Sequence, residues 1–185
     1  MNWDRYVNDL TSVLNSLVVT GREGATLDAG TGFSQLVQYV RNCGRDRRRV
    51  YFVGNGASAS MASHFSTDLA KMSNVPSEVF TDSALITATG NDMGYAESFA
   101  FPLSQRMVKG ELLIAISSSG NSPNTVRACE VARQFDGRVV TITAMSEDNK
   151  MRVLGDLNFY IQAETYGMAE SGHAVLLHHL IDLFQ

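Results

Sequence analysis

The sequence predicts a three-layer α/β/α protein, in which helices cover both faces of a central, mostly parallel sheet of five strands. The first observation is that short apolar segments of strand length alternate with longer helical segments from residue 50 onward. The second is that these strands are mostly apolar along their whole length, and Leu112–Ile116 is the clearest of them. Strands of that kind are typical of parallel sheets that are buried on both faces.

The N-terminal region is predicted to add helices ahead of this alternation. Apolar residues recur at helical spacing from Trp3 to Val18, and again from Phe33 to Val40 after a break at Gly21–Gly24. A helix that precedes the first strand lies outside the alternating pattern, and such helices often pack against a partner subunit. We therefore expect residues 1–45 to form a helical segment that is used in oligomerisation.

The alternating segments follow one another without a linker, an internal repeat or a low-complexity tract. The predicted strands are Val50–Val53, Glu78–Phe80, Leu112–Ile116, Arg138–Ala144 and Leu157–Ile161. The predicted helices are Ala57–Met72, Ala96–Met107, Pro123–Phe135 and about Ala169–Leu183. A chain of 185 residues that is 44% apolar has enough material for a full core, so residues 1–185 are predicted to be a single domain.

Composition argues against several classes of function. A net charge of −4 disfavours general binding to nucleic acid or to a membrane surface. One basic run, at Arg45 and Arg47–Arg49, is interpreted as a solvated loop ahead of a strand rather than a binding patch. Cys43 and Cys129 give neither a disulfide framework nor zinc-finger spacing. The sequence has no signal peptide and no apolar run of transmembrane length, so we expect a cytoplasmic protein.

The segment Ser117–Asn124, with the sequence SSSGNSPN, is the most informative feature of the chain. It lies between an apolar strand and a predicted helix, so free backbone N–H groups and the positive end of the helix face it. It has no lysine, unlike a Walker loop, and no G-x-G-x-x-G pattern. A hydroxyl-rich turn without charge suits the phosphate of a small sugar, although an ordinary Ser/Gly loop is the alternative.

A second turn of this kind, Gly54–Ser58, also connects a strand to a helix. Because ligands in such sheets bind beyond the carboxyl ends of the strands, both turns are placed at the expected binding edge. On the helix that follows, His64 and Asp68 are four residues apart and therefore lie on one face. That pair suits a metal site or an acid–base couple, but the spacing alone favours a surface contact.

The last predicted helix carries four acids or imidazoles among residues that are otherwise mostly Ala, Val and Leu: Glu170, His173, His178 and His179. His178 and His179 point roughly 100° apart, so they cannot share one role. Glu170 and His178 are separated by about 12 Å of rise in a continuous helix. Spacing therefore does not place them on one ion, unless Glu170 precedes the regular helix or meets the ion through a long reach.

Three motifs together resemble the sugar isomerase (SIS) domain, which has a flavodoxin-like fold. They are GNGAS at 54–58 leading to His64-Phe65, LITA at 85–88 leading to Gly90-Asn91-Asp92, and ISSSGNSPN at 116–124. The serine loop alone is specific for SIS domains. The Asn91-Asp92 pair and the pattern of the final helix resemble, more narrowly, the phosphoheptose isomerase branch, and the match runs from about residue 30 to the C-terminus.

The resemblance implies an aldose–ketose isomerase that converts sedoheptulose 7-phosphate to D-glycero-D-manno-heptose 7-phosphate through an enediol. Its product would be a heptose precursor for lipopolysaccharide, capsule or a related glycan. The family's phosphate loop falls on Ser117, Ser118, Ser119 and Ser122. Its sugar contacts fall on Asn55, Gly56, Ala57, Asn91, Asp92 and Glu170. Its metal ligands fall on His64, Asp68, Glu170 and His178, with Asp68 as the catalytic base and His178 as the acid or shuttle.

Three of these positions depart from the family's pattern. Ala57 stands where glycine is usual, Asp68 replaces a glutamate base, and Glu170 replaces a glutamine. Two imidazoles and two carboxylates still form a ligand set that suits zinc. The resemblance also implies a homotetramer whose sites are built at subunit interfaces.

Two other functions are compatible with the same domain. A non-catalytic SIS module would bind a partner protein or sense a sugar phosphate, like the family's tetrameric branch that binds the bacterial replication initiator. The departures at Asp68 and Ala57 keep this alternative open. However, that branch does not retain the metal-site residues, whereas all four metal-site positions of this chain are ionisable or coordinating. An archaeal-type hexulose-phosphate isomerase is disfavoured by Asn91-Asp92 and by the final helix.

Overall fold

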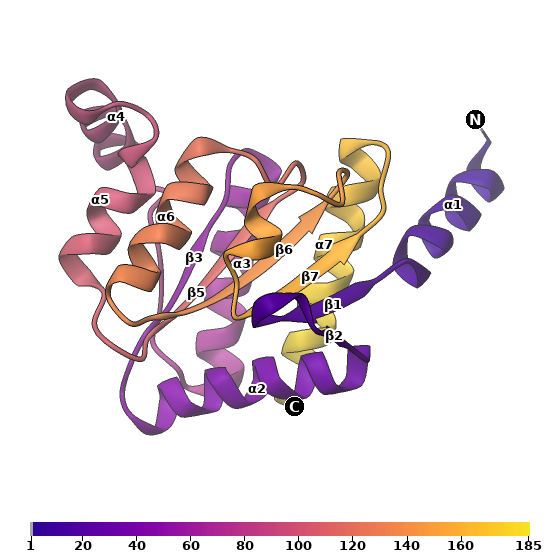
Figure 1. Ribbon diagram of the computed structural model, residues 1–185, viewed down its shortest axis with the longest axis horizontal. Coiled ribbons are helices and arrows are strands. Elements are labelled where there is room, and N and C mark those ends of the chain that lie inside the picture. Colours follow the sequence, from indigo (N-terminus) through magenta and orange to yellow (C-terminus); the bar gives the residue numbers. More distant parts are fainter. Residues whose placement is uncertain (1) are drawn as a thin grey trace.

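The computed structural model describes residues 2–185 and contains one sheet of seven strands, in the spatial order β2-β1-β7-β6-β5-β3-β4 (Figure 1). The strands are β1 (Val18–Gly21), β2 (Thr26–Leu27), β3 (Val50–Val53), β4 (Ser77–Val79), β5 (Leu112–Ser117), β6 (Arg138–Ala144) and β7 (Leu157–Ile161). The five strands from β7 to β4 are parallel to one another, as the sequence predicts. Their carboxyl ends therefore meet at one edge of the sheet.

The hairpin formed by β1 and β2 enlarges the sheet from the predicted five strands to seven. β1 pairs antiparallel with β7, where Val18 lies opposite Tyr160, and β2 pairs antiparallel with β1. The sequence predicts Val18 as the end of the first helix instead, and that prediction is wrong. β1 takes its hydrogen bonds from a strand near the other end of the chain, and the apolar spacing within one segment does not reveal such a partner.

Residues 2–185 form seven α-helices and two short 3-10 helices. The α-helices are α1 (Trp3–Asn15), α2 (Ala29–Arg45), α3 (Ala57–Ser73), α4 (Ser83–Met93), α5 (Glu97–Arg106), α6 (Pro123–Gln134) and α7 (Tyr166–Asp182). The 3-10 helices are η1 (Arg22–Gly24) and η2 (Lys150–Val153). No helix of the described residues is long and apolar enough to cross a membrane.

Local capping determines where two of these helices begin. Asp82 accepts a hydrogen bond of 2.9 Å from the backbone N–H of Leu85 and starts α4, a helix that the sequence analysis does not contain. Only Thr89 of α4 is buried, so the helix has no apolar stripe that would have indicated it. Thr165 caps α7, which consequently begins at Tyr166, three residues before the predicted start.

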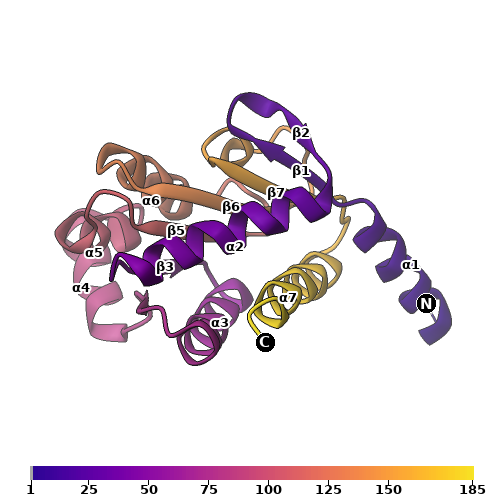
Figure 2. The same cartoon turned by 90° about the horizontal axis from the view of Figure 1, so that it is seen from below.

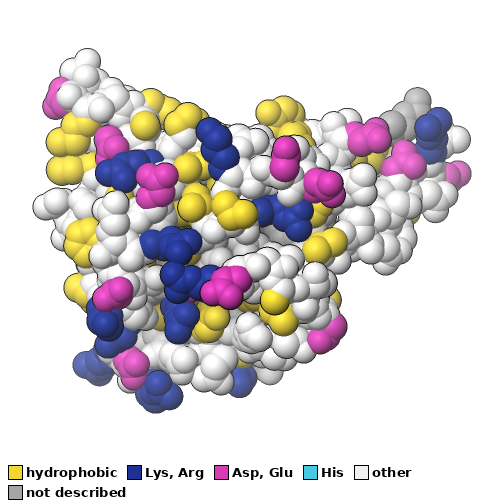
Figure 3. All heavy atoms as spheres, in the orientation of Figure 1, with side chains coloured by type: hydrophobic (Ala, Val, Ile, Leu, Met, Phe, Trp, Pro, Cys, Tyr) yellow, Lys and Arg dark blue, Asp and Glu magenta, His cyan; other side chains and the backbone are white. Residues whose placement is uncertain are grey.

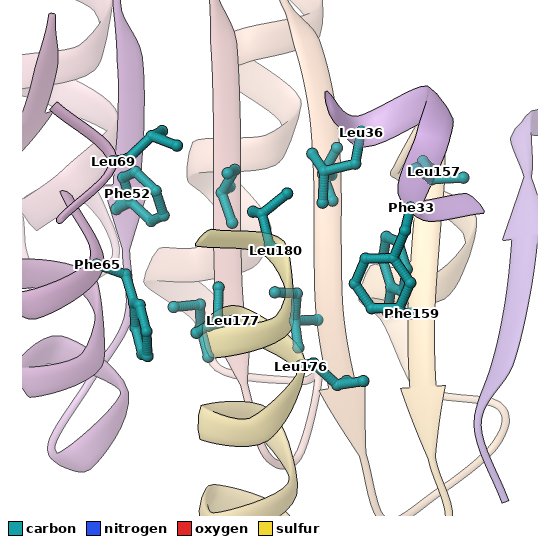
Figure 4. Close-up of a cluster of buried hydrophobic side chains, with 14 of the residues drawn as sticks. Phe33, Leu36, Phe52, Phe65, Leu69, Leu157, Phe159, Leu176, Leu177 and Leu180 are labelled. Atoms are coloured by element: carbon teal, nitrogen blue, oxygen red, sulfur yellow. The ribbon is translucent and has the colours of Figure 1, made fainter. Parts of the chain in front are cut away.

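Alternate residues of the central strands face the two helical layers. Val50 and Phe52 of β3 pack with α2, α3 and α7, whereas Tyr51 and Val53 pack with α5 and α6. Figure 2 shows α3 and α7 on one side of the strands and α6 on the other. In the larger of the two clusters, drawn in Figure 4, leucines of α7 lie against the sheet, beside Phe65 of α3. This packing brings α3 and α7 side by side next to the binding edge.

Two helices extend beyond the three-layer body at opposite ends of the molecule, α1 and α4 (Figure 1). α1 has no fully buried residue, and the side chain of Trp3 is 74% exposed. Exposed apolar surface is therefore available on the N-terminal helix, as oligomerisation through residues 1–45 requires. That role stays a prediction.

Candidate active site

The serine loop begins at the end of β5 and leads into α6. Gly120 turns the loop with a φ of 61°, and a side chain at this position would collide with Asn149. The backbone N–H of Gly120 donates to the hydroxyl of Ser117 at 3.1 Å, which closes the loop on itself. The Ser122 hydroxyl lies 3.5 Å from that of Ser117 and makes no capping bond to α6. Ser122 is therefore available to a ligand at the positive end of the helix.

The turn after β3 brings a second helix N-terminus to the same edge of the sheet. Gly56 precedes α3 with φ 55° and ψ −123°, a conformation that glycine adopts readily and other residues do not. No side chain caps this helix. Because β3 and β5 are neighbouring parallel strands, the turn lies beside the serine loop. The N-termini of α3 and α6 thus both point to one place, where an anion would be stabilised.

A cavity of about 270 Å³ lies between the two turns. Its lining residues are Asn55, Gly56, Ala57, Ser58, Ser117, Ser118, Ser119, Ser122, Tyr166 and Glu170. The cavity thus collects eight of the ten predicted substrate-binding residues, and Ser58 and Tyr166 are lining residues that the sequence analysis missed. No lysine or arginine lines it, and Glu170 is its one charged residue. Hydroxyl and backbone groups would therefore do the binding.

An amide network fixes the wall between the turn after β3 and the serine loop. The side chains of Asn55 and Asn124 exchange two hydrogen bonds of 2.9 Å each. Asn124, which is fully buried, also donates to the Ser98 hydroxyl at 3.1 Å, and the Tyr95 hydroxyl donates to Asn55 Oδ1 at 2.9 Å. The family resemblance implies that Asn55 contacts the sugar, and it gives Asn124 no role. The position of Asn124, directly after Pro123 at the start of a helix next to the serine loop, was the sequence feature that could have indicated its role.

A second group of predicted functional residues lies where α3 faces α7. His64 Nε2 is 3.2 Å from Asp68 Oδ2, and the ring centroids of His64 and His178 are 5.7 Å apart. The side chain of His64 is 56% exposed and that of Asp68 is 25% exposed, so a ligand or a second chain can reach both of them. An accessible carboxylate and two imidazoles at this separation are the groups that proton transfer at a sugar requires.

Glu170 does not join this second group. Because α7 is continuous from Tyr166 to Asp182, Glu170 and His178 are about 12 Å apart along the helix axis. Among residues 2–185, no three His, Cys, Asp or Glu side chains lie close enough together to hold a metal ion. One chain therefore does not assemble the four predicted zinc ligands, and the zinc site stays a prediction.

Asn91 and Asp92 lie at the exposed C-terminal end of α4, which projects from the body of the molecule (Figure 1). Asn91 Nδ2 donates to Asp92 Oδ1 at 2.8 Å, and neither residue lines the serine cavity. A single chain does not bring this pair to the cavity. Their assignment as sugar contacts stays a prediction.

His173 is the first of the three histidines of α7 and is fully buried. Neither ring nitrogen has a hydrogen-bond partner among the described residues. Burial lowers the pKa of His173 to about 4, and the nearby backbone of Thr143 offsets only part of this effect. His173 is therefore neutral at physiological pH, which makes it a poor proton donor for chemistry near neutrality.

Comparison with known proteins identifies the family. The model of the SIS domain family matches residues 6–144, which include both turns and the serine loop. A phosphoheptose isomerase of Trichlorobacter lovleyi is 32% identical over 144 residues, which cover 74% of this chain and 72% of the relative. The chain belongs to the phosphoheptose isomerase family of SIS-domain proteins.

Two further relatives extend the comparison. A phosphoheptose isomerase of Helicobacter pylori is 32% identical over 143 residues, which cover 74% of each chain. Among solved structures, a phosphoheptose isomerase from Francisella tularensis has a TM-score of 0.81 at 21% identity and covers 100% of this chain and 98% of its own. The SIS fold predicted from the three sequence motifs is thus confirmed.

Proposed function

We propose that the protein is an aldose–ketose isomerase that converts sedoheptulose 7-phosphate to D-glycero-D-manno-heptose 7-phosphate through an enediol. The proposal rests on two features of a chain of the phosphoheptose isomerase family: a hydroxyl-lined cavity without cations, and the His64–Asp68–His178 group on α3 and α7. The product would be a heptose precursor for lipopolysaccharide, capsule or a related glycan.

The serine cavity would bind the phosphate of the sugar. Five serines and two helix N-termini meet there, and hydrogen bonds to a charged group contribute about 1.5–3 kcal/mol each. This binding energy is remote from the reacting carbons. It would hold the carbon chain in a fixed position and thereby lower the entropic barrier to proton transfer.

Proton transfer would be the work of Asp68 and His178. As base, Asp68 takes a proton from C1 of the ketose and returns it to C2. His178 transfers the second proton, from the oxygen on C1 to the oxygen on C2. The reaction gains and loses no proton or electron overall. His64 lies 3.2 Å from Asp68 and would orient its carboxylate toward the carbon.

Distances along the helices support a site made from two chains. Ala57 lines the cavity, and Asp68 follows eleven residues later on α3, about 16 Å along the axis. A seven-carbon sugar phosphate reaches only roughly 10 Å from C1 to phosphorus, at about 1.25 Å per bond. We propose that Asp68 and His178 of one chain face the cavity of another within a homotetramer. Glu170, on the cavity wall, would then meet that group across the interface.

The surface around His178 supports such an interface. Val175 is on the same helix, one turn earlier, and its side chain is 44% exposed. Exposed apolar residues next to candidate catalytic groups are consistent with burial by another copy of the chain.

The proposal includes zinc because the donor set suits it. His64, Asp68, Glu170 and His178 supply the imidazole and carboxylate ligands that zinc prefers, but no three of them lie close enough together in one chain, so the site would form only on assembly of the chains. When bound, zinc would polarise the sugar oxygens and so acidify the proton that Asp68 removes.

Incubation of the purified protein with sedoheptulose 7-phosphate, followed by NMR of the sugar, tests the function. We expect the signals of D-glycero-D-manno-heptose 7-phosphate to appear with the wild type and to be strongly reduced with Asp68→Asn. Binding of the sugar phosphate without turnover would assign the chain to the non-catalytic alternative. Turnover of other ketose phosphates only would change the substrate but not the reaction class.

A further inference from the structure

A second cavity, of about 420 Å³, opens at the other edge of the sheet, where β5 and β6 begin. Its lining residues are Arg22, Arg48, Lys109, Gly110, Arg133, Asp136, Gly137, Arg138 and Asp156. Five cations and two carboxylates therefore line one cavity of a chain whose net charge is −4. Figure 3 shows lysine and arginine side chains gathered on this face of the molecule. We call this site the basic cavity.

The two carboxylates of the basic cavity are already paired. Asp156 lies 3.6 Å from Arg22 and 3.4 Å from Arg138, and Asp136 lies 3.2 Å from Lys109. The other Asp156 carboxylate oxygen accepts the backbone N–H of Val139 at 2.9 Å. The cavity thus retains an excess of positive charge after its internal ion pairs are counted.

Arg48 and Arg133 account for much of that excess. Neither forms an ion pair with a carboxylate among residues 2–185, as the ion pairs of the described chain show. The sequence indicates that Arg48 belongs to a solvated loop, but the tertiary structure groups it with cations from α6, η1 and β6. Unpaired guanidinium groups that converge on a concave surface favour an anion that can bind several of them at once.

Both unpaired arginines lie against the backbone. Arg133 Nη1 donates to the carbonyl oxygen of Leu154 at 3.2 Å. Arg48 lies across Gly110, whose φ is 82°, so closely that a side chain at Gly110 would overlap its guanidinium group. Cations that are positioned before the ligand arrives lose less side-chain entropy on binding. The basic cavity is therefore partly preorganised.

We propose that the basic cavity binds a multivalent phosphate anion, either pyrophosphate itself or the phosphate chain of a nucleotide. Guanidinium groups form paired hydrogen bonds with phosphate oxygens, and several phosphates are needed to satisfy several arginines. A cavity of about 420 Å³ limits the ligand to a small molecule. A long nucleic acid is not expected, because the chain as a whole is acidic.

This site is separate from the serine cavity. β5 begins beside Gly110 of the basic cavity and ends at Ser117 of the serine loop, so the two sites lie at opposite ends of the same strand. Its six residues span about 20 Å. One ligand cannot occupy both sites, and the proposal does not depend on the isomerase activity.

Calorimetric titration with pyrophosphate and with ATP, at about 50 mM salt, tests the proposal. We expect Arg48→Ala/Arg133→Ala to weaken binding at least about tenfold, and Arg48→Lys/Arg133→Lys to weaken it less, because the charge remains while the paired guanidinium hydrogen bonds are lost. The matched control is Arg5→Ala/Arg41→Ala, which removes the same charge outside the cavity and should bind as the wild type does. Ser117→Ala/Ser119→Ala should also retain the site, because it changes only the serine loop.

The outcomes separate the ligand sources and the alternatives. Tighter binding of ATP than of pyrophosphate assigns a nucleotide, and equal binding assigns the phosphate chain alone. The proposal is overturned if neither ligand binds the wild type, or if both arginine-to-alanine pairs weaken binding equally. It is also overturned if binding disappears with the serine changes and persists without Arg48 and Arg133.

Discussion

The side-chain amides of Asn55 and Asn124 donate to each other, both at 2.9 Å, and thereby join the turn after β3 to the serine loop. Asn124 is completely buried, while Asn55 lies on the cavity wall. The Oδ1 atom of Asn55 accepts from Asn124 and from the Tyr95 hydroxyl, so Asn55 has one remaining side-chain N–H for a substrate. Asn124 is therefore a positioning residue for this part of the site.

The first prediction concerns Asn124→Leu, which keeps the approximate volume and removes the amide. Asn55 and the buried Ser98 hydroxyl lose a partner, which should cost about 1–3 kcal/mol of unfolding free energy. We expect the KM for the sugar phosphate to rise, because the remaining Asn55 amide is no longer held in place. Urea unfolding and steady-state kinetics measure both effects, and Asn42→Leu, at a half-buried position of α2 away from the site, is the control. Unchanged kinetics would remove Asn124 from the site.

The second prediction concerns Asp68 as base. Asp68→Asn keeps the shape and removes proton transfer, so kcat for the isomerase should fall by about 10²–10⁴-fold. Asp68→Glu restores the residue typical of the family and should be tolerated. Wild-type kcat in Asp68→Asn would show that the base lies elsewhere. Activity that appears only with Asp68→Glu would show that the natural chain is a binding module.

The third prediction tests whether each site contains two chains. Ser117→Ala/Ser119→Ala destroys the phosphate cavity and Asp68→Asn destroys the base, so each variant alone should be nearly inactive. Co-expression should restore activity in up to about a quarter of the sites if the oligomer mixes randomly and the two halves come from different chains. Mixed oligomers can be isolated with two affinity tags. No recovery in these mixed oligomers would place the cavity and Asp68 of one chain in the same site.

The fourth prediction concerns metal. Protein purified without added metal and then equilibrated with zinc should hold about one ion per chain at neutral pH, where most histidine is unprotonated. His64→Ala and His178→Ala should each lose most of it, whereas His179→Ala, next to His178 but on another face of α7, should not. Elemental analysis gives this result independently of activity. Failure of the wild type to bind zinc would refute the proposed ligand set.

The fifth prediction follows from His173, whose pKa is lowered to about 4 by burial. The unfolded chain takes up this proton near pH 6.5, so unfolding is favoured as the pH falls from about 6.5 toward 4. The full effect of this one residue is about 3 kcal/mol. His173→Leu should abolish its share of the pH dependence, so its unfolding free energy should decline less steeply over that range. Urea unfolding at several pH values checks this, and an equally steep decline would contradict it.

Local residue patterns were sufficient for the fold class and for the serine cavity. The parallel strands and the binding edge follow from alternating apolar segments, because periodicity reports burial within each segment. The turns at Gly54–Ser58 and Ser117–Asn124 were assigned correctly because glycine, serine and proline specify loop and helix-start geometry at short range. α4 was missed because nearly all of its surface is exposed, and a helix without a buried face leaves no apolar stripe.

Only the tertiary structure decided which distant residues meet. The amino-acid order by itself indicated an SIS-type α/β domain, a phosphate-binding serine loop and a set of candidate imidazoles and carboxylates. It did not indicate that β1 pairs with β7, that Asn124 holds Asn55, that His64 lies beside His178 while Glu170 does not, or that Arg48 joins Arg133. Helix and strand propensity and helix capping depend on residues close together in the sequence, so each segment can be interpreted by itself. These contacts depend instead on which strands and helices become neighbours, and that is determined by the packing of the whole chain.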